Sequence, residues 1–263
     1  MGEFSKVEIE GHLMVVTINR PEVYNALHHV ANAELAEVFD KFAADPELWV
    51  AIITGAGDKA FSAGNDLKYH AEYQAKNGVR PPMAVKGFGG LTARYDLDKP
   101  VIAAVNGVAM GGGFEIALAC DILIASDQAK FALPEPRVGL AAAAGGMQRL
   151  SRQIPLKKAM GMMLTGRHVS AAEGYELGFV TAVVPHKDLM AEARRWAGQI
   201  LECSPMSIRA TKQVVMRSLD APVLEMAARN TNYPAFLAMA ASEDTIEGPK
   251  AFAEKRKPNW KGR

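Results

Sequence analysis

The pattern of hydrophobic and polar positions differs between the two halves of the chain. In the first half, alternating apolar residues from Val7 to Ile18, broken by Gly11, predict a hairpin. Apolar positions then recur at helical spacing from Asn25 to Phe42 and stop at Asp45-Pro46, which predicts a helix. Three short apolar runs predict buried strands, at 50–54, 101–105 and 122–125. The repeated order of strand, turn and helix predicts an α/β fold with short parallel strands.

The second half of the chain is mainly helical. Glycine and proline residues separate five predicted helices, at 145–154, 156–165, 171–177, 189–202 and 205–219. One late strand is predicted at 179–184. The small-residue stretch from Gly55 to Gly64 reads as a loop, and the polar segment from Tyr69 to Arg94 has no clear period. We expect a core over residues 1–195 that carries the functional site, followed by a helical C-terminal region over residues 196–263.

Composition and charge are typical of a soluble globular protein. The 263 residues are 49% hydrophobic, which is enough for one large domain with a smaller appendage. The net charge of +1 argues against a general nucleic-acid or acidic-membrane surface. The sequence shows no secretory leader and no apolar run of the roughly 18 residues that a membrane span needs. We therefore expect a cytoplasmic protein.

Cysteines and histidines give no support for metal chemistry. Cys120 and Cys203 lack the spacing of a metal knuckle or a redox pair, and we expect two buried thiols in a reducing compartment. The six histidines are scattered, and the pair His28-His29 has no acidic or cysteine partner at ligand spacing. No metal site is expected.

The most chemically informative stretch begins with the glycine triplet Gly111 to Gly113. It follows a strand and precedes an apolar helix, so it places bare backbone N–H groups at a helix N-terminus. Such donors suit an oxyanion. Glu115 lies in the first turn of this helix, where partial desolvation would raise its pKa toward neutrality. The alternative is that Glu115 only complements the helix dipole.

A second carboxylate, Glu135, strengthens the case for acid–base chemistry. It stands between Pro134 and Pro136, which should stiffen a loop and keep it out of a helix. A side chain held in this way can be aimed at a fixed point, although an ordinary solvated glutamate has the same local composition. Two carboxylates and a run of free amides are sufficient for acid–base chemistry on a carbonyl compound.

Four motifs in order resemble the enoyl-CoA hydratase/isomerase (crotonase) superfamily. They are FSAGNDLK (61–68), NGVAMGGGFE (106–115), FALPE (131–135) and GGMQRL (145–150), and the tail AFAEKRKP (251–258) also looks like a hydratase ending. The resemblance implies a crotonase-like spiral of ββα units with a helical C-terminal region. It also implies a homotrimer or a dimer of trimers, in which that region contributes to assembly and to coenzyme A contact.

The resemblance also implies roles for individual residues. Ala63 and Gly112 would donate backbone N–H groups to the thioester oxygen, and Glu115 and Glu135 would hold one water between them. Coenzyme A, as part of the substrate rather than a separate cofactor, would meet the loop of Ala63, Gly64, Asn65 and Asp66, with Asp66 itself a structural cap. Phe236 and Lys255 would reach the nucleotide from a neighbouring subunit, and the Ala143 amide would help to hold the water.

The resulting expectation is an enoyl-CoA hydratase that adds water to a trans-2-enoyl-CoA. Enzymatic alternatives are a carnitinyl-type dehydratase, an aromatic hydratase-lyase, an isomerase or a thioester hydrolase on the same oxyanion site. A catalytically silent coenzyme A-binding or assembly subunit is the alternative of another class. Three positions depart from the family pattern: Asn65 replaces a common alanine, Pro136-Arg137 replaces an apolar pair, and Ala141 to Ala144 replace a proline and glycines. The added methyl group of Ala143 and the unassigned segment 69–94 leave the acyl group open.

Overall fold

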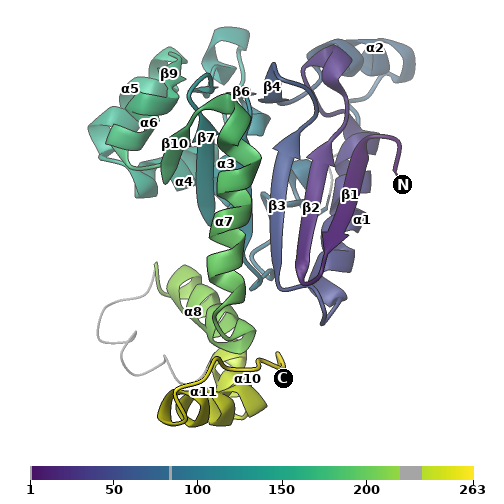
Figure 1. Cartoon of the computed structure of the whole chain (residues 1–263). Coiled ribbons are helices and arrows are strands. Elements are labelled where there is room, and N and C mark those ends of the chain that lie inside the picture. The colour runs from purple at the N-terminus through teal and green to yellow at the C-terminus, as the bar shows by residue number, and fades with distance from the viewer. Residues whose placement is uncertain (1, 83–84, 220–232) are drawn as a thin grey trace.

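A six-stranded sheet forms the centre of the fold in the computed structural model, which describes residues 2–82, 85–219 and 233–263 (Figure 1). The strand order is β1-β2-β3-β5-β7-β10. The strands are β1 (Ser5–Glu10), β2 (Leu13–Ile18), β3 (Val50–Gly55), β5 (Val101–Val105), β7 (Ile122–Ser126) and β10 (Ala182–Val184). β1 and β2 form the predicted antiparallel hairpin, and the other neighbours are parallel. The strands predicted at 50–54, 101–105 and 122–125 are therefore confirmed.

A second, four-stranded sheet has the order β4-β6-β8-β9. Its strands are β4 (Ala60–Ser62), β6 (Val108–Met110), β8 (Lys130–Ala132) and β9 (Val169–Ser170). β3, β5 and β7 are each followed along the chain by one strand of this sheet, and helices α2 (Leu67–Asn77) and α3 (Gly112–Ala119) complete two of the units. This is the expected spiral of ββα units. The sequence pattern missed β4, β6 and β8 because a three-residue strand is too short to show alternation.

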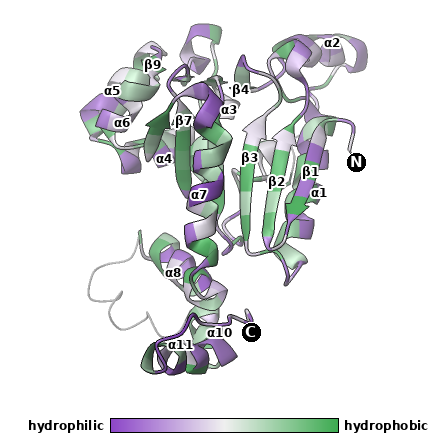
Figure 2. Cartoon of the chain, viewed as in Figure 1, coloured by the Kyte–Doolittle hydropathy of each residue, from purple (hydrophilic) through white to green (hydrophobic). Residues whose placement is uncertain are grey.

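Alternate residues of the central strands pack on opposite faces of the large sheet. Val16 of β2 belongs to the core that includes Phe39 of α1 (His29–Ala44), whereas Val15 packs in a second core with Ala193 of α7 (Leu189–Leu201). Helices α1 and α7 thus cover the two faces, and Figure 2 shows β2, β3 and β7 as the most hydrophobic ribbons between them. Such two-sided burial explains why β3 and β7 read as continuous apolar runs.

Helix α1 begins later than predicted. Tyr24 and Asn25 have positive φ angles of 54° and 55°, which end a short 3-10 turn, η1 (Pro21–Val23), and prevent a helix from starting at Asn25. His28 caps the helix instead, because its Nδ1 accepts a hydrogen bond from Ala31 N–H at 3.0 Å.

The described part of the segment from Tyr69 to Arg94 includes helix α2 and a tight 3-10 turn. α2 has no buried residue, which explains the missing hydrophobic period. A 3-10 turn, η2 (Phe88–Gly90), then packs against α1 and α3. Gly89 and Gly90 of this turn are buried, as are Leu91, Thr92 and Arg94 after it.

The C-terminal half is helical, as predicted. It contains α4 (Gly146–Gln153), α5 (Leu156–Thr165), α6 (Ala171–Leu177), η4 (His186–Asp188), α8 (Pro205–Ser218), α10 (Pro234–Ala240) and α11 (Glu243–Ala253). α7 runs unbroken across the boundary expected at residue 195, and Ala193 and Ala197 are both buried against the sheet. Residue 195 therefore lies inside a helix, and the division into a core over residues 1–195 and a C-terminal region stays a prediction.

Helices α8, α10 and α11 form an arm that extends below the body of the molecule in Figure 1. Residues 220–232 of the predicted helical region lie outside the described residues. Cys203, where the arm begins, is exposed, so the expectation of a buried thiol is wrong there, whereas Cys120 is partly buried. Within the described ranges no helix has both the length and the apolar character needed to cross a membrane.

Candidate active site

The N-terminus of α3 combines a free backbone donor with a close contact between two chain segments. Gly111 caps the helix with φ +52° and ψ −124°, a conformation that residues with side chains rarely adopt. Gly113 lies so close to β4 that a Cβ on it would stand 2.0 Å from the Ser62 carbonyl oxygen. Gly112 N–H makes no hydrogen bond to any residue that the structure describes. An oxygen atom could therefore approach this amide directly.

Glu115 lies one turn further along α3 and is only 3% exposed. Its Oε1 accepts a hydrogen bond from Gly146 N–H at 2.8 Å. Burial raises the pKa of Glu115 to about 7; the Gly146 hydrogen bond opposes this change and the charge of Glu135 adds to it. The expected increase in pKa is confirmed, and it allows proton exchange near neutral pH.

Glu135 approaches the same helix end from the other side. It opens a 3-10 turn, η3 (Glu135–Val138), so the prediction that the flanking prolines keep it out of any helix is wrong. Pro136 fits the start of such a turn because the first N–H groups need no intrahelical acceptor. Glu135 Oε1 lies 3.1 Å from the point where a Cβ on Gly111 would stand. Its Oε2 is buried without a hydrogen-bond partner in the described part of the chain, and burial raises the pKa of this carboxyl group.

The loop before α2 supplies a different backbone donor from the one expected. Ala63 N–H donates to the Tyr24 carbonyl oxygen at 2.9 Å, so it is not free for a thioester. Asn65 instead forms a parallel bridge with Leu27, in which Leu27 bonds to Gly64 O at 2.8 Å and to Asp66 N–H at 3.2 Å. In this geometry the N–H of Asn65 itself points away from Leu27. It has no partner among residues 2–82, 85–219 and 233–263, and the role predicted for Ala63 fits Asn65 instead.

Gly64 brings this loop beside α3. It has φ +87°, and a Cβ there would lie 2.6 Å from Met110 O and 2.9 Å from Gly112 N. The free N–H groups of Asn65 and Gly112 therefore belong to backbone segments in direct contact. Two such donors can form an oxyanion hole.

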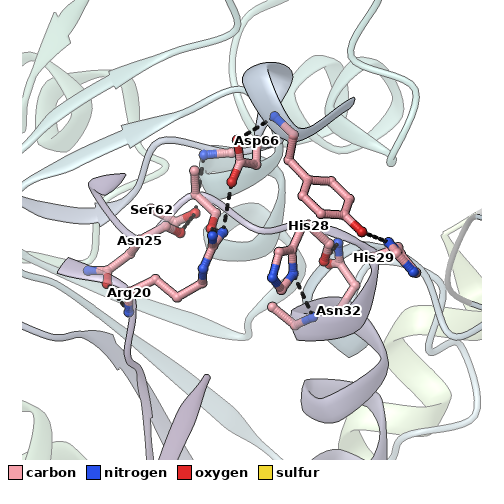
Figure 3. Close-up of polar contacts among 11 residues, drawn as sticks. Arg20, Asn25, His28, His29, Asn32, Ser62 and Asp66 are labelled. Atoms are coloured by element: carbon pink, nitrogen blue, oxygen red, sulfur yellow. Dashed lines mark hydrogen bonds and ion pairs between the residues drawn. The ribbon is translucent and has the colours of Figure 1, made fainter. Parts of the chain in front are cut away.

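A buried polar network fixes the loop (Figure 3). Arg20 forms an ion pair with Asp66 at 3.0 Å, and both side chains are only 12% exposed. Asp66 also caps α2 by accepting the Tyr69 N–H at 3.1 Å, which confirms its predicted capping role. Ser62 Oγ donates to Asn25 O at 2.8 Å and accepts the Gly64 N–H at 3.1 Å. Hydrogen bonds to Gly64 and Asp66, the two residues next to Asn65, thus fix the position of the Asn65 N–H.

Three other predicted site residues do not show their expected contacts within the single chain. Ala143 is exposed and its N–H donates to Ala141 O at 2.8 Å, so it does not present the free amide expected beside a water. Phe236 on α10 and Lys255 after α11 belong to the C-terminal arm, which lies apart from α3 and β4 in Figure 1. A role for these two residues at the site would need a second copy of the chain.

Two contributors were missed by the sequence reasoning. The Asn65 amide is selected by the bridge to Leu27, and no local pattern in the loop marks that long-range pairing. The Gly146 N–H, which donates to Glu115, belongs to a glycine pair at the start of α4 and could have been considered as a helix N-terminus. Among the described residues, no group of three metal-ligating side chains converges.

The fold and this arrangement of glutamates and amides define a crotonase-type site, and the chain belongs to the enoyl-CoA hydratase/isomerase family, whose model matches residues 8–263. It is 46% identical to the carnitinyl-CoA dehydratase of Citrobacter koseri over 96% of both chains. It is 44% identical to the carnitinyl-CoA dehydratase of Escherichia coli K12 over 100% of both. Among solved structures, an enoyl-CoA hydratase from Mycobacterium tuberculosis H37Rv superposes with a TM-score of 0.92 at 34% identity, with both chains fully covered.

Proposed function

We propose that this protein adds water to, and removes it from, the C2–C3 bond of a coenzyme A thioester. One observation carries the proposal: the buried Glu115 and the half-buried Glu135, whose Oε2 is itself buried, lie at the helix end where Gly112 N–H has no partner among the described residues. Hydration and dehydration of a thioester need this combination, because charge develops on the thioester oxygen while protons move at C2 and C3.

In hydration, the N–H groups of Gly112 and Asn65 stabilise the negative charge that develops on the thioester oxygen. The ionised glutamate accepts a proton from the water that attacks C3, and the protonated glutamate donates a proton to C2. Dehydration follows the same steps in reverse. Burial raises the pKa of Glu115 to about 7, so this carboxyl group can hold or release a proton near neutral pH, and burial also raises the pKa of Glu135.

For the substrate we propose carnitinyl-CoA, whose C3 hydroxyl group leaves as water. The support is the 44–46% identity over nearly the full length of relatives that carry this name, compared with 34% for the enoyl-CoA hydratase structure from Mycobacterium tuberculosis H37Rv. A shared oxyanion hole hosts several reactions, so the acyl group must be tested directly.

The test is to mix purified protein with carnitinyl-CoA, crotonyl-CoA and an aromatic enoyl-CoA and to identify products by mass. Loss of water from carnitinyl-CoA, abolished in Glu135→Gln, is the expected result. Hydration of crotonyl-CoA alone would favour a general hydratase. A shifted double bond would indicate an isomerase, and free coenzyme A a hydrolase. Binding without conversion in every case would indicate a silent subunit and contradict the proposal.

We also propose assembly into a trimer or a pair of trimers through the C-terminal arm. Two apolar side chains of α11 are strongly exposed in the single chain, Ile246 at 73% and Phe252 at 87%. Contact with a neighbouring copy would bury them and could bring Phe236 and Lys255 to the neighbour's coenzyme A. Light scattering of the purified protein measures the assembly, and a monomer at micromolar concentration would contradict it.

A further inference from the structure

A glycine-rich turn holds one aromatic ring beside the thioester site. Gly89 and Gly90 have φ angles of +62° and +67°, and a Cβ on them would lie 2.4 Å from Ile116 Cδ1 and 2.6 Å from Ala36 Cα. Only glycine fits at either position, because the turn is wedged between α1 and α3. Phe88 is therefore the one residue of η2 that carries a large side chain.

Hydrogen bonds from two other elements fix the position of Phe88. Its N–H donates to Thr92 Oγ1 at 2.8 Å, and the next N–H, from Gly89, donates to Asn32 Oδ1 at 2.6 Å. Asn32 is itself buried and donates to His28 O at 3.1 Å (Figure 3). The buried Asn32 side chain thus attaches the turn to α1. The backbone position of Phe88 is therefore fixed by contacts with the rest of the fold.

The ring of Phe88 lies against Gly112, the residue with the free N–H. A Cβ built on Gly112 would stand 2.5 Å from Phe88 Cε1. In an α-helix the Cα–Cβ bond tilts toward the N-terminus, the same end at which the first N–H groups are free. The half-buried ring therefore stands beside the position of a thioester oxygen bound to Gly112.

Charges of both signs lie near this ring: Arg94 Nε donates to Gly90 O and Arg149 Nη2 donates to Thr92 O, each at 2.9 Å, while the acidic groups of the site attract a cationic acyl group. Glu115 and Glu135 are the acidic groups of the site, and Glu135 Oε2 has no partner within the described ranges. A trimethylammonium group on C4 would lie about 5 Å from the thioester carbonyl carbon, given single bonds of about 1.5 Å. Cation–π attraction acts when a cation is within about 6 Å of a ring centroid. The ring and the cation are then within reach of each other.

We propose that Phe88 recognises the quaternary ammonium group of the substrate through its π face and so sets specificity for a cationic acyl chain. This inference rests on the proposed function, because it takes the cation from carnitinyl-CoA. It adds a recognition role to a residue that has no part in proton transfer. The ring would select the substrate while the glutamates perform the chemistry.

Binding of two unreactive saturated thioesters tests the inference separately from catalysis. One is trimethylammoniobutyryl-CoA, and the other is its uncharged isostere with a tert-butyl group in place of the ammonium. Calorimetric Kd values are measured for the parent protein, for Phe88→Leu, which keeps an apolar side chain, and for Phe88→Tyr, which keeps the π face.

The expected result is that Phe88→Leu weakens binding of the cationic thioester about tenfold or more and changes binding of the isostere much less. Phe88→Tyr should retain most of the preference. Equal losses for both thioesters in Phe88→Leu, or no loss, would overturn the inference. The two proposals fail in distinguishable ways, because failure to dehydrate carnitinyl-CoA concerns turnover, whereas the charge preference is read from binding alone.

Discussion

The buried carboxyl group of Glu115 should make the stability of the fold depend on pH, and Glu115→Gln should remove that dependence. Glutamine keeps the size of the side chain, and its carbonyl oxygen can still accept the Gly146 N–H that now lies 2.8 Å from Oε1. It cannot ionise. The substitution therefore isolates the cost of placing a negative charge in a side chain that is 3% exposed.

The magnitude follows from the pKa of this group. Burial raises it from 4.5 to about 7, and each pKa unit corresponds to about 1.4 kcal/mol, which gives about 3 kcal/mol in total. The folded state binds the proton more tightly than the unfolded state. The stabilising contribution is therefore fully present below about pH 4.5 and is lost as the pH rises through about 7.

Denaturant unfolding of both proteins at a fixed protein concentration, from about pH 5 to about pH 8, measures the effect. Over this pH range, the free energy of unfolding of Glu115→Gln should rise by about 2–3 kcal/mol relative to that of the parent protein. Glu135→Gln is the control: it removes a neighbouring charge, so the change attributed to Glu115 should move to lower pH. A difference between parent and variant that stays constant with pH would refute the argument.

Three further predictions concern the backbone donors and their support. Replacing the amide N–H of Asn65 by an ester oxygen should lower kcat about a hundredfold. The same change at Ala63 is the control, because the Ala63 N–H bonds to Tyr24 O and is no donor to the thioester. Similar losses of kcat at both positions would contradict the placement of the donor at Asn65. Arg20→Met leaves Asp66 buried without its partner, so it should destabilise the fold by about 3 kcal/mol and lower kcat more than it raises KM. The double variant Arg20→Met/Asp66→Asn should recover part of the stability. An unchanged kcat in Arg20→Met would show that the ion pair is purely structural. Gly112→Ala places a methyl group 2.5 Å from Phe88 Cε1, so the thioester affinity measured by calorimetry should fall at least tenfold. Unaltered affinity would show that the Phe88 ring moves freely.

Local patterns were sufficient for much of the fold because each long element carries its own signal. The central strands β3 and β5 are buried on both faces and therefore read as continuous apolar runs. The helix start after the glycine triplet is equally local, since free N–H groups follow from helix geometry alone. Both the α/β class and the raised pKa of Glu115 could be predicted from such features. The hydrophobic pattern gave no sign of α2, because all of its side chains remain at least partly exposed.

The sequence by itself determined which residue types the site contains: a glycine triplet, two glutamates and a loop with a capping aspartate. Tertiary structure alone decided which amide is available, because Ala63 N–H is taken by Tyr24 O while the bridge to Leu27 turns the Asn65 N–H outward. It also decided that Phe88 lies on Gly112. The physical reason is that a backbone donor or a ring acquires its role from partners distant in the chain, and one-dimensional spacing carries no record of those contacts.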